Sequence, residues 1–347
     1  AVARGVILGR SKVQWSRVLS FDDPCMCRAA ISSADVELFP TAKGRFHTDI
    51  TQIGMNGLWM HRIQASLPQI STIKIKSGRR SIGFLTESSS APLSHAGMEI
   101  LPGDIVLNNT DVAHQRSGAD FRFGTVSLPL EDLAATAEIT VGRGLPEKLH
   151  KITIRPASTL MNRLLNLHKS MGRLAHDAPD VLEVSEVRRA LHSQLVHFVV
   201  KCLADGLAIE PSARSRRHNA IVERFEEFLE ANSDRPLYLM EICAALGVAE
   251  RTLRACCEEH LGMGPIRYLT LRRMHLVRRA LQRSNAAQST ITGIVTDHGF
   301  WELGRFAVAY RALFGEPPSA TLRRQAVELP LKSNRPSSFV TTELANS

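Results

Sequence analysis

The sequence predicts an α+β protein with several domains: a small antiparallel β-barrel with a helical hairpin, then an all-α C-terminal domain with two helix-turn-helix units. Three observations lead to this prediction. Between residues 36 and 128, short alternating segments are separated by Gly, Pro, Asn and Ser. Between 156 and 205, apolar residues recur with the period of a helix. From 218 to 325, turn glycines interrupt amphipathic helical patterns.

Length and composition fit this organisation. The 347 residues suffice for two or three domains with a core each, and the 44% hydrophobic and 22% charged residues are ordinary for a globular protein. No apolar run approaches the ~20 residues that cross a bilayer, and no signal-peptide core is recognisable. The six cysteines lack paired C-x-x-C spacing, so reduced thiols are expected. We therefore expect a cytoplasmic protein with no membrane partner.

Positive charge is concentrated near the C-terminus. The whole chain carries a formal net charge of +9. Residues 248–325 hold twelve arginines, no lysine and six acidic residues, a net charge of +6. A basic region of this kind suits a partner rich in phosphate.

The alternating segments are expected to be short strands. They are RFHTDITQIG, LWMHRIQAS, ISTIKIKSG, RRSIGFLTES, MEILPGDIVLNN and FRFGTVSLP. Regular short strands favour an antiparallel barrel or sandwich. The turn at 102–104 is expected to connect the two strands of a hairpin.

Two amphipathic segments between 156 and 205, separated by AHDAPD, predict an antiparallel pair of helices. This pair has two possible roles, packing against the barrel and presenting a surface to a second subunit. The polar residues 206–217 are expected to form a linker. The expected division is therefore 1–205 for a sensor or dimerisation domain, 218–325 for the helical domain and 326–347 for a disordered tail.

Two segments have the pattern of a helix-turn-helix, which needs a small residue in its first helix and a turn residue that tolerates positive φ. In the first segment, Cys243 is the small residue and Gly247 the turn. In the second, from 291 to 315, Gly299 is the turn. Two such units in one chain indicate a protein that reads two neighbouring stretches of DNA.

The exposed residues of each second helix are the candidates for DNA contact, because residues near the start of that helix reach base edges. Arginine can donate two hydrogen bonds to guanine. The candidate base-reading residues are Arg251, Thr252, Arg254, Gly304 and Arg305, and the candidate phosphate contacts are Arg272, Arg273 and Arg311.

A long helix is predicted between the two units. Pro265 suits the first position of a helix, and the pattern continues to Arg283. Its nineteen residues span about 28 Å, at ~1.5 Å per residue. Successive major-groove faces recur every ~34 Å. The two reading helices are therefore expected on one side of the duplex, about one turn apart.

The region from about 220 to 324 resembles the AraC/XylS family of transcription regulators. The resemblance rests on the block LMEICAALGVAERTLRACCEEHLGMGPIRYLTLRRM and, more specifically, on ITGIVTDHGFWELGRFAVAYRALFGEPPSATLR. It implies seven helices, two DNA-reading units and a connecting helix at 265–283. It also implies a regulator of transcription, expected here as an activator, and not an enzyme. The sequence departs from the family at Val295, where alanine is usual, and at Thr321, where tyrosine is usual.

In such regulators the N-terminal domain commonly binds a small molecule or mediates dimerisation. Here the strand-rich region resembles a small cupin barrel, and the block PGDIVLNNTDVAHQ places the cupin histidine at His114. A cupin metal site also needs a His-x-His, which is missing, so a metal-free pocket without a cofactor is expected. The candidate pocket residues are His47, Trp59, His61, Phe84 and His114, although Trp59 and Phe84 also suit the core.

Three functions remain open. The first is a homodimeric regulator that binds double-stranded promoter DNA and a small-molecule effector, with RNA polymerase as a partner if it activates. The second is a ligand-independent regulator whose N-terminal domain only dimerises. The third is a metal-dependent cupin enzyme with an attached DNA module, which would require a bound metal.

Overall fold

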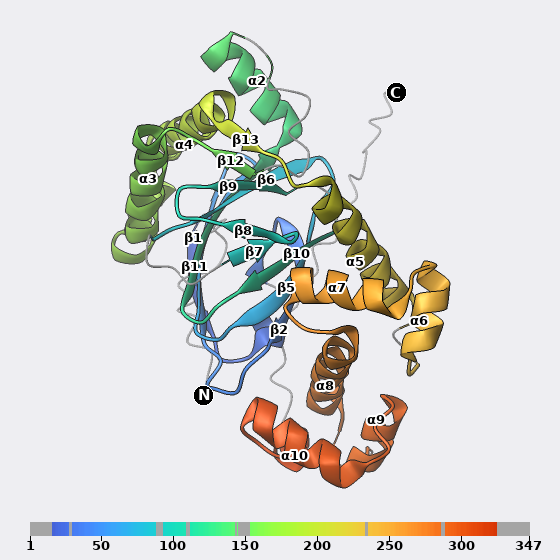
Figure 1. The fold of residues 1–347 in the computed structure, drawn as a ribbon. Coiled ribbons are helices and arrows are strands. Elements are labelled where there is room, and N and C mark those ends of the chain that lie inside the picture. Colours follow the sequence, from blue (N-terminus) through green and yellow to red (C-terminus); the bar gives the residue numbers. More distant parts are fainter. Residues whose placement is uncertain are drawn as a thin grey trace, which may run out of the picture.

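A computed structural model describes residues 16–27, 30–87, 93–108, 112–142, 144, 153–232, 235–285 and 289–324. These residues form an N-terminal β-domain and a C-terminal helical domain that contact each other (Figure 1). The predicted tail at 326–347 lies outside the described residues. Within them, no helix combines the length and the apolar run of a membrane span.

Two antiparallel sheets form the β-domain. In spatial order, the large sheet contains β1 (Ser16–Phe21), β3 (Thr48–Met55), β4 (Leu58–Ala65), β11 (Phe121–Pro129), β6 (Arg79–Leu85), β9 (Ile105–Asn108), β12 (Thr153–Arg155) and β13 (Leu207–Ile209). The small sheet contains β2 (Ala34–Pro40), β5 (Gln69–Ile75), β10 (Val112–Ser117), β7 (Leu93–His95) and β8 (Met98–Ile100). The predicted antiparallel β-barrel is confirmed in this form, with two facing sheets rather than one closed ring of strands.

The turn at 102–104 does not close a hairpin, so this expectation is wrong. β8 pairs with β7 in the small sheet, whereas β9 pairs with β6 and β12 in the large sheet. The chain therefore crosses from one sheet to the other at this turn. Asp104 stabilises the crossing, because its Oδ2 accepts a hydrogen bond from the backbone N–H of Leu101 over 3.0 Å.

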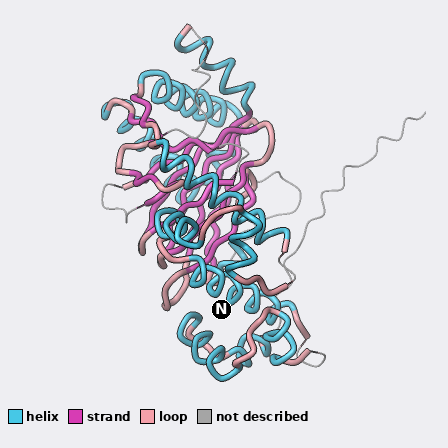
Figure 2. Tube along the Cα trace, turned by 45° about the vertical axis from the view of Figure 1, so that its right-hand side comes forward, coloured by secondary structure: helices cyan, strands magenta, loops and turns pink. Residues whose placement is uncertain are grey.

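Strand alternation gives the large sheet two apolar faces. On β3, Ile50 belongs to the cluster between the two sheets. Ile53 and Met55, on the opposite face, belong to the core formed with the helices. That core contains α2 (Leu130–Val141), α3 (Ser158–Asp177) and α4 (Ser185–Asp205), with the 3-10 helix η2 (Pro179–Glu183) between the last two. The predicted helical pair thus packs against the barrel, and Figure 2 shows the strands with helices on either side of them.

Seven α-helices follow in the described part of the C-terminal region. They are α5 (Ala213–Ala231), α6 (Leu239–Leu246), α7 (Glu250–Leu261), α8 (Pro265–Arg283), α9 (Ile291–Asp297), α10 (Leu303–Phe314) and α11 (Pro318–Arg323). The segment 206–217, expected as a linker, contains β13 and the first residues of α5. The strand forms because 207–209 can pair with β12 at the free edge of the large sheet.

The helical domain has two small cores that share α8. Tyr268, Leu269 and Leu271 of α8 pack with α5, α6 and α7. Met274 and Val277, one to two turns later, pack with α9, α10 and α11. The helix therefore fixes the two helix-turn-helix units relative to each other, as its uninterrupted pattern predicts.

Candidate nucleic-acid interface and ligand cavity

The first helix-turn-helix consists of α6, a turn at Gly247 and α7. Gly247 has φ = 64°, a conformation that suits glycine, and its N–H caps α6 by donating to the carbonyls of Cys243 and Ala244. Ile242 and Leu246 of α6 are buried together with Leu253 of α7. This packing fixes the angle between the two helices and leaves the opposite face of α7 open to solvent.

Two arginines near the start of α7 are exposed. Arg251 and Arg254 point away from the core, whereas Thr252 is half-buried. Arg254 makes an ion pair of 2.9 Å with Glu250, one turn earlier. Because both side chains are about half exposed, this pair contributes little stability and Arg254 is available for another acceptor.

The second unit is fastened to α8 at its turn. Gly299 has φ = 78°, and a Cβ at this position would lie 2.9 Å from Pro236. Arg273 of α8 donates to the carbonyl oxygen of Gly299 over 3.5 Å, and its guanidinium lies 5.1 Å from the centre of the Phe300 ring. Arg273, a candidate phosphate contact, is thus held in a structural position.

Helix α10 presents a small, mixed surface. Phe306 and Tyr310 are buried, while Gly304, Arg305 and Arg311 are exposed. Arg305 pairs with Glu302 over 2.9 Å at a strongly exposed position. Two apolar residues of the same segment, Trp301 and Val308, are also more than two-thirds exposed. Trp301 was not among the sequence candidates, because an aromatic residue after a turn is ordinarily part of the core.

Arg272, another candidate phosphate contact, is not exposed. It is buried and forms an ion pair with Glu226 of α5, and its guanidinium lies 5.9 Å from the centre of the Phe39 ring. A buried guanidinium that is paired with a carboxylate is not placed to reach a phosphate, so the predicted phosphate contact of Arg272 is not supported. Of the three candidate phosphate contacts, Arg311 is the exposed one.

Helix α8 is also the main contact to the β-domain. His275 donates from Nε2 to the carbonyl oxygen of Pro40 over 3.1 Å. Arg279 pairs with Glu37 of β2 over 3.0 Å. Because His275 is buried and the Arg279 side chain is nearly so, these polar contacts are shielded from water.

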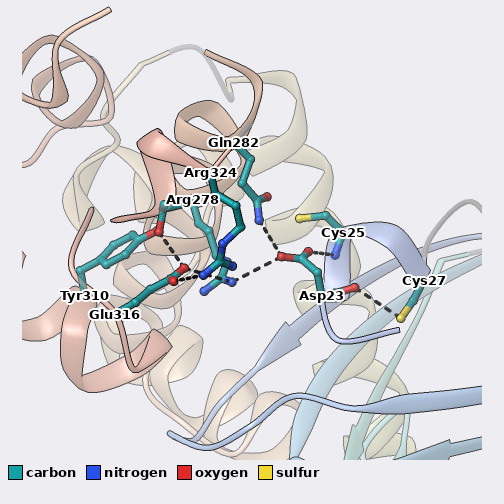
Figure 3. Close-up of polar contacts among 9 residues, drawn as sticks. Asp23, Cys25, Cys27, Arg278, Gln282, Tyr310, Glu316 and Arg324 are labelled. Carbon is teal, nitrogen blue, oxygen red and sulfur yellow. Dashed lines mark hydrogen bonds and ion pairs between the residues drawn. The ribbon is translucent and has the colours of Figure 1, made fainter. Parts of the chain in front are cut away.

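Asp23 extends this contact to the second unit (Figure 3). It precedes the short helix α1 (Pro24–Cys27) and accepts hydrogen bonds from Gln282 over 2.6 Å and from Arg278 over 3.4 Å. Arg278 also lies 3.5 Å from Glu316, which pairs with Arg324. A polar chain therefore runs from the β-domain to the end of the helical domain.

The unusual Thr321 takes part in this chain. Its hydroxyl donates to Glu316 and accepts from the Tyr310 hydroxyl, both over 2.9 Å. Val295, the other departure from the family pattern, is fully buried in the core of the second unit. Both departures are thus accommodated without loss of the motif.

A cavity lies between the two sheets. The empty space between its lining atoms totals about 690 Å³, including the part open to solvent. Much of the lining is aliphatic or aromatic, and the remainder is hydroxyl, amide and thiol. The described lining residues include no Asp, Glu, Lys, Arg or His.

The small sheet separates this cavity from the helical domain. On β10, Gln115 lines the cavity. Its neighbour His114 lies 3.7 Å from Glu226 of α5, and Arg116 reaches Gly262 at the end of α7. Successive residues of one strand thus face the cavity and the helical domain in turn.

The same alternation occurs on β2 and β5. On β2, Val36 and Leu38 line the cavity. Phe39 of the same strand faces α8 and packs edge-on against Tyr268, with the ring centres 6.4 Å apart. On β5, Gln69 lines the cavity and Ile70 belongs to the core of α5 to α8. One layer of backbone therefore connects the cavity with the first helix-turn-helix unit.

The five candidate pocket residues are not brought together. His47 is half-exposed and bonds to Asp22 over 2.9 Å, which raises its pKa. Trp59 is half-buried with its ring against Gly54. Neither residue lines the cavity.

The other three candidates are buried elsewhere. His61 contacts the Thr125 hydroxyl over 3.1 Å, and burial lowers its pKa to about 4. Phe84 packs 5.0 Å from the His168 ring in the core beneath the helices. His114 faces α5, so none of these three lines the cavity either. Among the described residues, no group of three or more His, Cys, Asp or Glu is arranged to hold a metal ion.

Comparisons with known proteins agree with the geometry of the helical domain. Residues 242–324 match a family model described as "Helix-turn-helix domain". The chain is 33% identical over 155 residues to the "Probable thc operon regulatory protein" of Rhodococcus erythropolis, covering 42% of this chain and 45% of that protein. It is 36% identical over 110 residues to the "XylDLEGF operon transcriptional activator 1" of Pseudomonas putida, covering 32% and 33%. The chain thus matches less than half the length of these curated relatives.

A solved structure gives a wider but weaker match. The "AraC-like transcriptional activator CuxR" is 17% identical, with a TM-score of 0.39, over 81% of this chain and 99% of that one. The identification rests instead on the helix-turn-helix match, on the operon regulators aligned with it, and on the two units joined by α8. Residues 242–324 thus form a helix-turn-helix domain similar to those of operon regulators such as the XylDLEGF activator, as the AraC/XylS resemblance of this region predicts.

Proposed function

We propose that this chain is a sequence-specific DNA-binding regulator of transcription, in which α7 and α10 read promoter DNA and the β-domain binds a small-molecule effector. The observation that carries the proposal is the placement of exposed arginines on two helices that pack against one connecting helix. Arg251 and Arg254 lie at the start of α7, and Arg305 and Arg311 lie on α10. The relatives described as an operon regulatory protein and an operon transcriptional activator support it.

The dimensions of α8 suit one face of B-DNA. Its 19 residues span about 28 Å, compared with the ~34 Å between successive major-groove faces. In this arrangement Arg251, Arg254 and Arg305 contact bases, with Thr252 and Gly304 at the same ends of their helices. Arg311 contacts a phosphate, and Trp301 and Val308 supply apolar contacts of the kind that thymine methyl groups accept.

Control by an effector is supported by the small sheet. A ligand in the cavity contacts the inward side of β2, β5 and β10, and α5, α7 and α8 pack against their outward side. A ligand that binds more tightly to one arrangement of these strands shifts the population of that arrangement. The packing of the helical domain, and with it the relative placement of α7 and α10, then changes with occupancy.

We take the protein to be a cytoplasmic activator, acting as a homodimer on double-stranded promoter DNA and contacting RNA polymerase there. The ligand-independent regulator is the second candidate. It differs from the first in one measurable property, because a small molecule would then leave its DNA affinity unchanged.

DNA binding is tested with the full chain and a DNA site selected from a random library. Arg251→Ala and Arg254→Ala are each expected to weaken specific binding by about 1–3 kcal/mol per lost bidentate contact. Arg189→Ala is the matched control, because Arg189 is also an exposed helical arginine, on α4, and is likewise paired with a glutamate of its own helix, Glu186. If both α7 variants bind the selected site as tightly as the control, the proposed reading helix is wrong.

A further inference from the structure

We propose that the cavity between the sheets binds an uncharged ligand with an apolar body and a hydrogen-bonding end, and that Gln69, Asn108 and Gln115 hold this end. The inference rests on the proposed function in that it takes this cavity as the effector site. It adds the chemical class of the effector and the residues that select it.

The described lining of the cavity carries no charged side chain, which indicates an uncharged ligand. A buried carboxylate, phosphate or ammonium group needs a counter-charge or a dense set of hydrogen bonds, because removing it from water is strongly unfavourable. The described lining offers hydroxyls, amides and a thiol, and no carboxylate, ammonium, guanidinium or imidazole group. A charged ligand would therefore lose its hydration without gaining an ion pair.

Three side-chain amides in the lining indicate that the ligand has a hydrogen-bonding end. Gln69, Asn108 and Gln115 are each at most 5% exposed, and each has one amide atom without a hydrogen-bond partner. Buried polar atoms almost always have a partner, so three unpartnered amides around one cavity indicate a polar group that is supplied from outside the chain. An amide can offer either a donor or an acceptor by rotating, so these residues can match a carbonyl, a hydroxyl or another amide.

The amides lie on both sides of the cavity. Gln69 and Gln115 are on neighbouring strands of the small sheet, where the register pairs Gln115 with Ser71 and Gln69 with Ser117. Asn108 is on β9 of the large sheet, paired with Ser81. The polar end of a ligand held by all three thus connects the two sheets, and one of these sheets carries the helical domain on its other face.

Apolar side chains account for the rest of the lining. Ile50 and Ile63 come from the large sheet and Ile73 from the small sheet, and Phe121 and Phe123 line the cavity from β11. Burial of an aliphatic chain or a ring against them is favourable without further polar contact. The ligand class is therefore a small primary carboxamide, alcohol or ketone on an apolar body, and not the corresponding acid or amine.

The class is tested with matched pairs of small probes on the full chain at pH 7.5. Benzamide and hexanamide are the neutral probes, and benzoate, hexanoate and hexylammonium are charged probes of similar size. We expect saturable binding of at least one neutral probe by calorimetry, with a rise in Tm, and no binding of its charged counterpart. Failure of both neutral probes, or a charged probe that binds as tightly as the neutral one of its shape, overturns the proposal.

Isosteric variants test the assigned residues. Gln115→Met and Asn108→Leu each replace a buried amide that has one unpartnered atom with an apolar group, so the Tm of the free protein is expected to stay the same or rise. Neutral-probe binding is expected to weaken about fivefold or more, which corresponds to the loss of one hydrogen bond. A lower Tm together with unchanged probe affinity would show that these amides are structural.

Gln52→Met is the control, because Gln52 is equally buried but lies outside the cavity lining and donates from Nε2 to the Ser32 hydroxyl over 2.9 Å. It is expected to lower Tm and leave probe binding unchanged. DNA affinity is measured on the same preparations with and without the probe. Probe binding that leaves DNA affinity unchanged contradicts effector control but keeps the ligand class, whereas intact control by a charged probe contradicts only the ligand class.

Discussion

Arg278 donates from Nη2 to Oδ2 of Asp23 over 3.4 Å, although the two residues are 255 positions apart in the chain. Arg278 belongs to the helix that joins the two DNA-reading units, and Asp23 precedes the short helix α1, whose Cys27 donates to the Asp23 carbonyl and lines the cavity. Asp23 therefore connects the cavity wall with α8, through its backbone carbonyl on one side and its carboxylate on the other. The β-domain thus contacts α8 through Asp23 as well as through the packing of the small sheet.

Asp23→Asn is expected to weaken this contact between the β-domain and α8. The substitution removes the charge but keeps the size, so the contacts with Arg278 and Gln282 lose their charge-assisted character. We expect a loss of about 1.5–3 kcal/mol in the free energy of unfolding, the range for hydrogen bonds to charged groups. Urea unfolding followed by circular dichroism measures it.

The control for this variant is the neighbouring position. Asp22 is about 40% exposed and pairs with Arg45 and His47 at the surface. Asp22→Asn is therefore expected to cost only about 0–1 kcal/mol, as exposed ion pairs do. Equal effects of the two variants would show that the buried contact with α8 contributes nothing special.

Stability is expected to fall with acid through histidines at the domain interface. Burial, the largest cause, lowers the pKa of His114 and of His260 to about 4, from an ordinary 6.5. Below pH 6.5 the unfolded chain binds protons that the folded protein does not. The free energy of unfolding therefore falls between pH 6.5 and pH 4, by up to about 1.4 kcal/mol per pH unit for each histidine.

Urea unfolding at several pH values measures this slope. His114→Leu is expected to reduce it, because this side chain no longer titrates in either state. His176→Gln, a substitution of an exposed histidine on α3, is the control. An unchanged slope in His114→Leu would exclude this histidine as a source of the pH dependence.

The helical domain could be predicted well because its signals are local. Turn glycines, helical periodicity and Pro265 lie within a few residues of the structure that they specify. The burial of Arg272 could not be predicted from local signals. It differs from the exposed Arg311 only through contacts with Glu226 and with Phe39, a residue of a strand more than 200 positions earlier.

The residues that line the cavity could not be predicted for a similar reason. When both faces of a strand carry similar residues, the sequence does not reveal which face points into the barrel. On β10 the resemblance to cupins therefore led to His114 as the predicted pocket residue. The neighbouring Gln115 lines the cavity, whereas His114 faces α5. The parity of this strand is set by the small sheet, which is buried on both sides only once the helical domain has packed against it.

Two glycines of the second unit are expected to respond oppositely to alanine. At Gly299 the positive φ strains any other residue, and a Cβ would also meet Pro236 and Arg273, so Gly299→Ala should cost about 1–3 kcal/mol. At Gly304, within α10, a Cβ meets no atom within 4 Å, so Gly304→Ala should stabilise the helix by up to about 1 kcal/mol. Thermal unfolding measures both, and a stabilised Gly304→Ala with weaker DNA binding would support close approach of the duplex at that position.

Arg311 and Arg272 are expected to affect DNA binding in different ways. Arg311 is exposed on α10, so Arg311→Ala should weaken binding to all sequences alike and reduce the slope of log K against log salt by about one. Arg272→Ala should instead leave the buried carboxylate of Glu226 unpaired, which costs about 3–5 kcal/mol of stability. Salt titrations of DNA affinity and urea unfolding of both variants separate the two roles. A reduced salt slope in Arg272→Ala, at unchanged stability, would return this arginine to the DNA interface.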